Sequence, residues 1–105
     1  MLKKLDPITP GEILLEEFMK PMGITQAKLA RDINVPPNRI SQIIHGKREI
    51  TADTALRLGR YFGIEPEFWL NLQMRYNMKM AKRMLGQIIE KEVQVCDVIE
   101  KAKAA

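Results

Sequence analysis

This chain of 105 residues has few of the side chains on which disulfides, metal centres and most catalytic sites depend. It contains one cysteine, Cys96, and one histidine, His45. A single cysteine excludes an internal disulfide and is typical of a protein from a reducing cytoplasm. One Cys and one His are too few for an all-protein zinc cluster. No nucleophile, base and orienting residue can be grouped from this inventory, so we expect neither an enzyme nor a cofactor.

Long apolar runs are lacking as well. No run approaches the roughly 20 residues that span a bilayer. The N-terminal stretch MLKKLDPITP has two lysines but no apolar segment behind them, so it does not resemble a secretory signal. We therefore expect a cytoplasmic protein without membrane contact. Its 46% hydrophobic and 29% charged residues are typical of a globular chain, of a length suited to one compact domain.

The net charge of +4 is unevenly distributed along the chain. Residues 21–60 contain seven basic and three acidic side chains, whereas residues 1–20 carry a net charge of −1 and residues 61–105 a net charge of +1. A local excess of positive charge is typical of a surface that binds phosphates, and chance clustering is the alternative. The middle of the chain is therefore the candidate nucleic-acid-binding part.

The stretch from Thr25 to Gly46 predicts two short helices joined by a tight turn. Asn34 ends the first helix, because asparagine tolerates left-handed backbone, and Pro37 suits the first position of the second. Each helix has an apolar face, formed by Leu29, Ala30, Ile33, Ile40, Ile43 and Ile44. The opposite face of the second helix is polar, with Asn38, Ser41, Gln42 and His45. The pattern indicates a helix-turn-helix, whose second helix lies in the DNA major groove.

Several side chains of this unit are candidates for contacts with double-stranded DNA. The amides of Asn38 and Gln42 match the edge of adenine in the major groove. Arg39 lies on the flank of the same face and suits either a guanine or a phosphate. The remaining candidates are expected to hold phosphates: Gln26, Ser41, His45, Lys47 and Arg48. The alternative is that they are ordinary solvent-facing residues.

The flanking segments predict three more helices, which makes the fold class all-α. Thr9 and Glu12 form a capping box around Pro10, and the helix that they open is expected to stop at Pro21. A later helix is expected between a Thr51 cap and Gly63, with Ala55, Leu58, Gly59 and Phe62 inside. Pro66 opens a fifth helix, with Trp69 on its inner face.

Beyond Asn77 the chain has no proline, and residues 78–104 predict a long helical extension. We divide the chain into a DNA-binding domain, residues 1–77, and this extension, residues 78–105. An apolar stripe runs along the extension through Ala81, Leu85, Ile88, Val95 and Ile99, with an interruption at Glu92. The stripe packs either back on the same chain or on another molecule, in a dimer or a partner contact.

The chain resembles the HigA (VapI) family of antitoxins in three segments, TPGEILLEEFMKPMGIT, ITADTALRLGRYFG and PEFWLNLQMRYN. Its helix-turn-helix resembles the wider Xre/lambda-repressor-like group. Together these matches cover about residues 7–77. The resemblance implies a five-helix domain that dimerises on operator DNA and represses its own operon. It also implies a partner, a HigB-type toxin that cleaves mRNA.

The family's recognition positions correspond to Pro37, Asn38, Arg39 and Gln42. The glutamine at the start of the first of its two helix-turn-helix helices corresponds to Gln26. The two prolines depart from the pattern, because Pro36 cannot cap with a side-chain oxygen and Pro37 cannot hydrogen-bond a base. We therefore expect an apolar contact there, with a thymine methyl for example.

The toxin-binding surface has two candidates, the tail stripe and an acidic face with Glu12, Glu16 and Glu17, because an RNA-binding partner is expected to be basic. Two rival functions remain open. One is a stand-alone regulator without a toxin, and the other is a protein-interaction module that has lost DNA binding.

Overall fold

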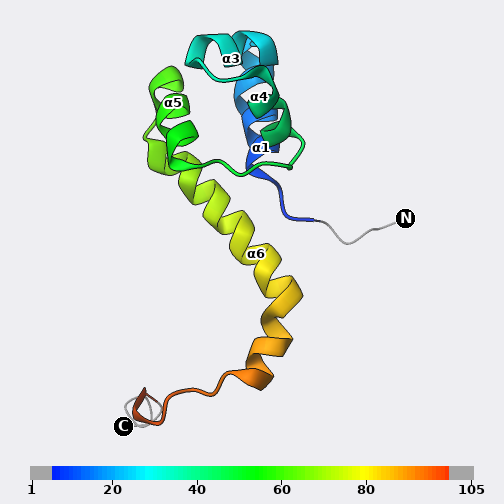
Figure 1. Cartoon of the computed structure of the whole chain (residues 1–105), viewed down its shortest axis with the longest axis vertical. Helices are drawn as coiled ribbons and strands as arrows, with labels where there is room; N and C mark the ends of the chain where they lie inside the picture. Colours follow the sequence, from blue (N-terminus) through cyan, green and yellow to red (C-terminus); the bar gives the residue numbers. More distant parts are fainter. Residues whose placement is uncertain (1–5, 100–105) are drawn as a thin grey trace, which may run out of the picture.

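The computed structural model describes residues 6–99, and this part of the chain is helical without strands (Figure 1). The first helix combines α1 (Pro10–Ile13), the π-helical turns of η1 (Leu14–Met19) and α2 (Lys20–Met22). The others are α3 (Gln26–Ile33), α4 (Pro37–Ile44), α5 (Ala52–Phe62) and α6 (Pro66–Glu92). The predicted all-α class with five helices is confirmed.

The first helix begins as predicted and ends later than predicted. The Thr9 hydroxyl accepts from the Glu12 N–H at 3.1 Å, and the Glu12 carboxylate accepts from the Thr9 N–H at 3.4 Å, so the capping box is confirmed. Pro21 does not stop the helix. The Lys20 N–H bonds to the carbonyl of Leu15, five residues back, and such a widened turn relieves the clash that a proline ring causes in an α-helix. The helix ends instead at Gly23, whose φ is +67°.

The core lies where the five helices meet. Its most buried side chains come from every helix: Leu14, Met19, Leu29, Ile40, Ile43, Leu58 and Trp69. Three phenylalanine rings surround Trp69 with ring centroids 4.8–6.1 Å away, which joins the start of α6 to the first helix and α5. Thr51 stands at the expected cap position of α5, but its side chain makes no capping hydrogen bond within the described part of the chain.

The first helix lies directly on α4. A Cβ on Gly11 would stand 1.9 Å from the carbonyl oxygen of Ile43 and 2.8 Å from Cα of Ile44. Only a residue without a side chain allows this approach, because both facing atoms belong to backbone. Gly11 therefore sets how closely α4 packs against the first helix. The capping-box pattern does not indicate this contact.

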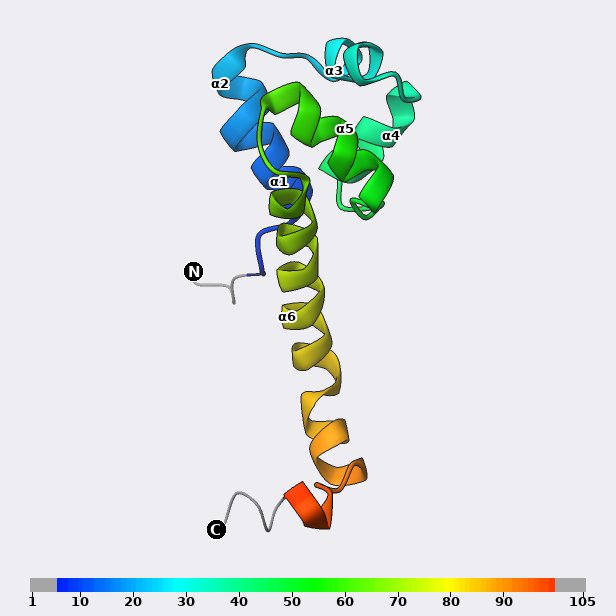
Figure 2. The ribbon, with the colours of Figure 1, turned by 90° about the vertical axis from the view of Figure 1, so that its left-hand side faces the viewer.

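Helix α6 leaves the compact part and projects from it, which gives the molecule extents of 56 × 38 × 22 Å (Figures 1 and 2). It runs without a break through residue 77, the predicted boundary between the DNA-binding domain and the extension, and that boundary stays a prediction. Beyond the compact part its apolar side chains are exposed, so the stripe does not pack back on its own chain.

The expected extension is only partly helical. Helix α6 ends at Glu92, so Val95 and Ile99 do not continue its stripe, and residues 100–104 lie outside the described range. None of the helices in residues 6–99 combines the length and apolar character needed to cross a membrane.

Candidate nucleic-acid interface

The two helices of the predicted helix-turn-helix are α3 and α4. The Thr25 hydroxyl caps α3 by accepting from the Lys28 N–H at 3.1 Å. Asn34 ends α3 with φ +59°, the one positive φ among the described non-glycine residues. The Val35 N–H then bonds back to the carbonyl of Ala30 at 3.0 Å, a Schellman closure that turns the chain tightly toward α4. The predicted role of Asn34 is confirmed.

The N-terminal half of α4 presents polar side chains to solvent. Pro36 stands at the cap with φ −60° and ψ 141° and makes no side-chain capping bond, and Pro37 occupies the first turn. Both Pro37 and Asn38 are exposed, whereas Ser41 and Gln42 are half-buried. The apolar face with Ile40, Ile43 and Ile44 is buried, as predicted. The polar face is therefore the outer surface of this helix.

Gln42 is held by the basic loop that follows α4. Its Oε1 accepts from Nε of Arg48 at 2.9 Å. An amide oxygen has two lone pairs, so Oε1 can hold Arg48 and still accept a hydrogen bond from a base. This contact restricts the rotation of the Gln42 amide.

The His45 ring is also engaged within its own helix end. Its Nδ1 lies 2.7 Å from the carbonyl oxygen of Ser41. A carbonyl only accepts, so in this contact Nδ1 carries the proton, and Nε2 of a neutral ring is an acceptor. The sequence predicts that His45 donates a hydrogen bond to a phosphate. With this geometry the Nε2 atom of a neutral ring can only accept, so its partner would be a hydrogen-bond donor instead.

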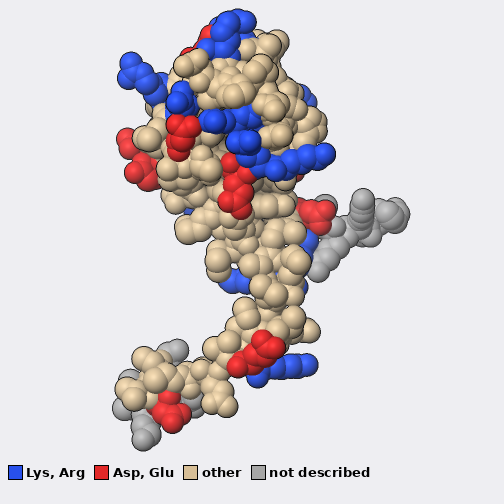
Figure 3. Space-filling view, in the orientation of Figure 1, with Lys and Arg blue, Asp and Glu red and all other residues tan. Residues whose placement is uncertain are grey.

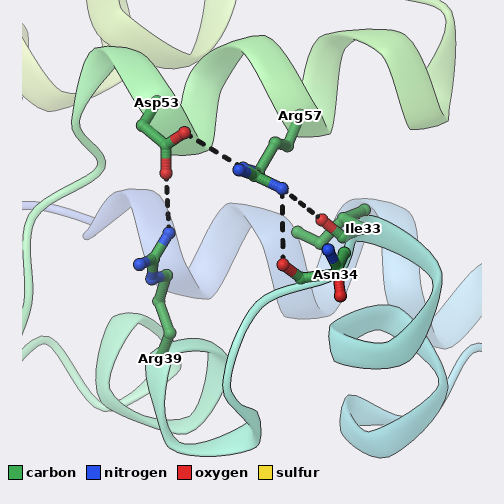
Figure 4. A network of polar contacts seen from close by, with 5 residues as sticks. All are labelled: Ile33, Asn34, Arg39, Asp53 and Arg57. Atoms are coloured by element: carbon green, nitrogen blue, oxygen red, sulfur yellow. Dashed lines mark hydrogen bonds and ion pairs between the residues drawn. The ribbon is translucent and has the colours of Figure 1, made fainter.

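Arg39 points away from the exposed polar face, toward α5 (Figure 4). Its Nη1 lies 2.8 Å from Oδ2 of Asp53, whose Oδ1 accepts from Nε of Arg57 at 3.0 Å. The hydrogen bonds from Arg57 and then Arg39 lower the pKa of the Asp53 carboxyl below its ordinary value, so Asp53 is ionised at neutral pH. Sequence spacing connects neither Asp53 nor Arg57 with Arg39, because the two residues lie 14 and 18 positions beyond it on another helix.

The basic loop with Lys47 and Arg48 is anchored to α6. The Ile50 N–H donates to Oε1 of Gln73 at 2.8 Å, and the Gln73 amide donates to Asn77 at 3.0 Å. Asn77 in turn donates to the Glu49 carboxylate at 3.2 Å. Gln73 is buried. A polar side chain on the buried face of a helix needs a hydrogen-bond partner, so its position in the sequence could have indicated this contact.

Charged side chains surround this unit, with positive charge in excess over residues 21–60. On the face drawn in Figure 3, Lys and Arg side chains lie over the compact part of the molecule, with Asp and Glu side chains among them. The last candidate, Gln26, is half-buried in the first turn of α3, where helix N–H groups favour an anion. The structure thus brings Gln26, α4 and the basic loop into one helix-turn-helix unit.

The acidic candidate face borders an apolar groove of about 590 Å³ between the first helix and α6. Its apolar lining comes from Ile8, Ile13, Phe18, Phe68 and Leu72, and Glu12, Glu16 and Glu17 complete it. All three glutamates are exposed, and Glu12 also serves the capping box.

Known proteins match this chain over most of its length. A helix-turn-helix family model matches residues 15–69. Virulence-associated protein I of Dichelobacter nodosus is 51% identical over 80 residues, which are 76% of this chain and 74% of that protein. A HigA-family addiction module antidote protein from Coxiella burnetii, 50% identical, superposes with a TM-score of 0.82 over 88% of this chain and 100% of its own. The Pseudomonas aeruginosa antitoxin HigA, solved with the higBA promoter, is 43% identical with a TM-score of 0.82 over 84% and 96% of the two chains.

Proposed function

Because this chain belongs to the helix-turn-helix family and, within it, to the HigA antitoxins, we propose that it binds the operator of its own operon, represses that operon and neutralises a HigB-type toxin. Bacterial operators lie in the cytoplasm, which is where the protein would act. The observation that carries the DNA-binding part is the exposed start of α4, with its outward polar face next to a basic loop.

In this proposal α4 enters the major groove, where base contacts give sequence specificity and phosphate contacts give affinity and position. Asn38 and Gln42 read base edges, and Pro37 makes an apolar contact. Lys47, Arg48 and Gln26 bind phosphates and set the position of the domain on the duplex. The Arg48–Gln42 hydrogen bond supports this division, because a preset amide loses less side-chain entropy when it binds a base.

Two alanine variants test this division of contacts. Gln42→Ala is expected to weaken binding to the operator by about tenfold to a hundredfold and to leave binding to unrelated DNA nearly unchanged, because one bidentate base contact discriminates by about 1–3 kcal/mol. Lys47→Ala is expected to weaken binding to both DNAs and to reduce the salt dependence by about one unit of slope. The measurement is fluorescence anisotropy with a duplex from the gene's own promoter and a scrambled duplex, across a salt series.

The two variants serve as controls for each other, because both residues are at or near the surface and neither lies in the core. Circular dichroism checks that both keep the wild-type helical content. If Gln42→Ala binds the promoter as tightly as wild type does, α4 is not the reading helix. If wild-type protein does not distinguish the two duplexes, the module without DNA binding is the better description.

We further propose that the protein is a homodimer held by α6. Exposed apolar residues recur along one face of this helix at alternating spacings of four and three: Met74, Met78, Ala81, Leu85 and Ile88. Such a heptad pattern predicts a two-helix seam with a second copy of the same helix. In a two-fold dimer the two α4 helices would then meet half-sites about 34 Å apart on one face of the duplex.

For the toxin we propose the groove between the first helix and α6. A basic partner with an apolar side chain suits an apolar floor with three glutamates along it, since charge complementarity speeds association and orients the partner. None of the residues assigned to DNA lines this groove, so in this proposal toxin and operator meet different side chains.

Charge reversal at Glu16 and Glu17 tests the groove. Glu16→Lys/Glu17→Lys is expected to abolish copurification of the toxin encoded beside this gene and to abolish rescue of growth, because the partner's cations would meet two new cations. Glu12 is left alone because it caps the first helix. The matched control is Glu65→Lys/Glu67→Lys, which makes the same charge change at exposed sites that do not line the groove.

The outcomes separate the remaining alternatives. Full copurification with the groove variant would move the toxin to another surface, such as the stripe of α6. If the toxin does not copurify with wild-type protein and that protein binds its promoter tightly, the chain is a stand-alone regulator.

A further inference from the structure

One carboxylate holds two arginines at the back of the recognition helix. Asp53, in the first turn of α5, accepts from Arg39 of α4 at 2.8 Å and from Arg57 of its own helix at 3.0 Å. Each arginine takes a different oxygen, Oδ2 for Arg39 and Oδ1 for Arg57 (Figure 4). The carboxylate is therefore divided between the recognition helix and α5.

Arg57 extends this network to the turn of the helix-turn-helix. Its Nη1 donates to the carbonyl of Ile33 at 2.9 Å and to that of Asn34 at 3.3 Å. These carbonyls lie at the C-terminal end of α3, where a cation satisfies unpaired acceptors and the helix dipole together. Asp53 thus connects α4, through Arg57, to the end of α3, so one network spans both helices of the DNA-binding unit.

Arg39 is constrained by this contact. Only 24% of its side chain is exposed, and its buried Nε has no hydrogen-bond partner among the described residues. A free surface arginine would attract any phosphate within reach. Paired with Asp53, its charge is offset and its guanidinium points along one direction.

We propose that Asp53 is a positioning residue for sequence-specific DNA binding. It fixes the orientation of Arg39 and, through Arg57, the angle between α3 and α4, and its negative charge lowers the affinity for unrelated DNA. The inference rests on the proposed binding of DNA by α4. Asp53 repels phosphates by its charge, so it weakens binding to every duplex. By holding Arg39 against α5 it fixes the position of α4, which favours only the duplex whose groove matches the exposed face of that helix.

The contact has a rival explanation with the opposite consequence. If Asp53 kept Arg39 away from DNA as a decoy for phosphate, loss of the carboxylate would release Arg39 and strengthen operator binding. If the pair were only a solvated ion pair, its loss would change little. The three explanations therefore differ in the ratio of affinities for operator and unrelated DNA.

Asp53→Asn tests the proposal, and Asp32→Asn is the matched control. Asp32 also lies in the helix-turn-helix unit, where it pairs with Lys28 at 2.8 Å and accepts from the Tyr61 hydroxyl of α5 at 2.7 Å. Among the described residues, Arg39 donates to Asp53 and not to Asp32. Both variants remove one negative charge. Affinities of the full chain for its promoter duplex and for a scrambled duplex of equal length are measured by anisotropy at several salt concentrations.

Asp53→Asn is expected to weaken promoter binding about tenfold, as for the loss of one charge-assisted hydrogen bond, while binding to scrambled DNA becomes tighter. Asp32→Asn is expected to shift both affinities in the same direction and leave their ratio unchanged. Tighter promoter binding by Asp53→Asn would establish the decoy, and an unchanged ratio would reduce the contact to a surface ion pair. Either result overturns the proposal.

A second variant covers loss of folding. If Asp53→Asn loses helical content, Asp53→Glu keeps the charge and displaces the carboxylate by one methylene. It is expected to keep the affinity for scrambled DNA and to weaken promoter binding, and unchanged promoter binding would refute the proposal. A wild-type protein that binds both duplexes equally would contradict DNA recognition by α4 as a whole, whatever Asp53 does.

Discussion

Leu85→Glu/Ile88→Glu is expected to convert the proposed dimer to a monomer and to weaken operator binding by about a hundredfold or more. The two side chains are 45% and 47% exposed, so they contribute little to the core and their loss should not unfold the domain. In the proposed seam they face the same residues of the second copy, where four buried carboxylates would repel one another. Each monomer then binds its half-site alone and loses the effective concentration that the dimer supplies.

Light scattering gives the oligomeric state of this variant, and anisotropy with the full promoter and with a single half-site gives the affinity. The half-site affinity should equal that of wild type, because α4 is untouched. The control is Lys79→Gln/Gln87→Glu, which makes the same net charge change at two exposed positions outside the apolar stripe. A dimeric Leu85→Glu/Ile88→Glu protein would rule out α6 as the seam.

Gly11→Ala is expected to be the most destabilising small substitution in the chain. The added Cβ would stand 1.9 Å from the Ile43 carbonyl oxygen, so the first helix must move away from α4. Overpacking of this kind costs about 1–3 kcal/mol, which corresponds to a fall in melting temperature of about 4–24 °C for a domain of this size. The cost is expected near the upper end, because backbone faces backbone. The shift also tilts α4, so operator affinity should fall even at temperatures where the variant is folded.

Gly86→Ala is the matched control, because it makes the same substitution in a helix with nothing within 4 Å of the new Cβ. There the higher helix propensity of alanine should stabilise the protein, by up to about 1 kcal/mol. Thermal unfolding followed by circular dichroism measures both. If the two variants melt at the same temperature, the close approach of the first helix to α4 is wrong.

Much of the helix-turn-helix was predictable because its signals are local. The capping box around Pro10, the left-handed Asn34 and the isoleucine spacing of α4 act through bonds within a few residues of each other. Such short-range signals depend little on the rest of the fold. The prediction failed at Pro21, where the rule for an α-helix did not foresee a π-helical turn that accommodates the ring.

The candidate site was predictable only in part. The outward polar face of α4 followed from periodicity, because residues on one side of a helix must face solvent when the other side is buried. The contacts of those residues did not follow. Arg39 meets Asp53, Gln42 meets Arg48, and the loop that carries Arg48 is anchored by Gln73. These pairs join different elements, and no sequence spacing encodes the distances between them.

The order of the helices, the residues at which most of them begin and the outward polar face of α4 can thus be inferred from residues near one another in the chain. Three features arise where helices distant in sequence meet. They are the packing of α4 against Gly11, the network of Asp53 and Arg57, and the groove beside Glu16. Periodicity indicates which face of a helix is buried, but not which neighbour buries it. The packing of the whole chain sets that neighbour, because each contact depends on the positions of all the helices together.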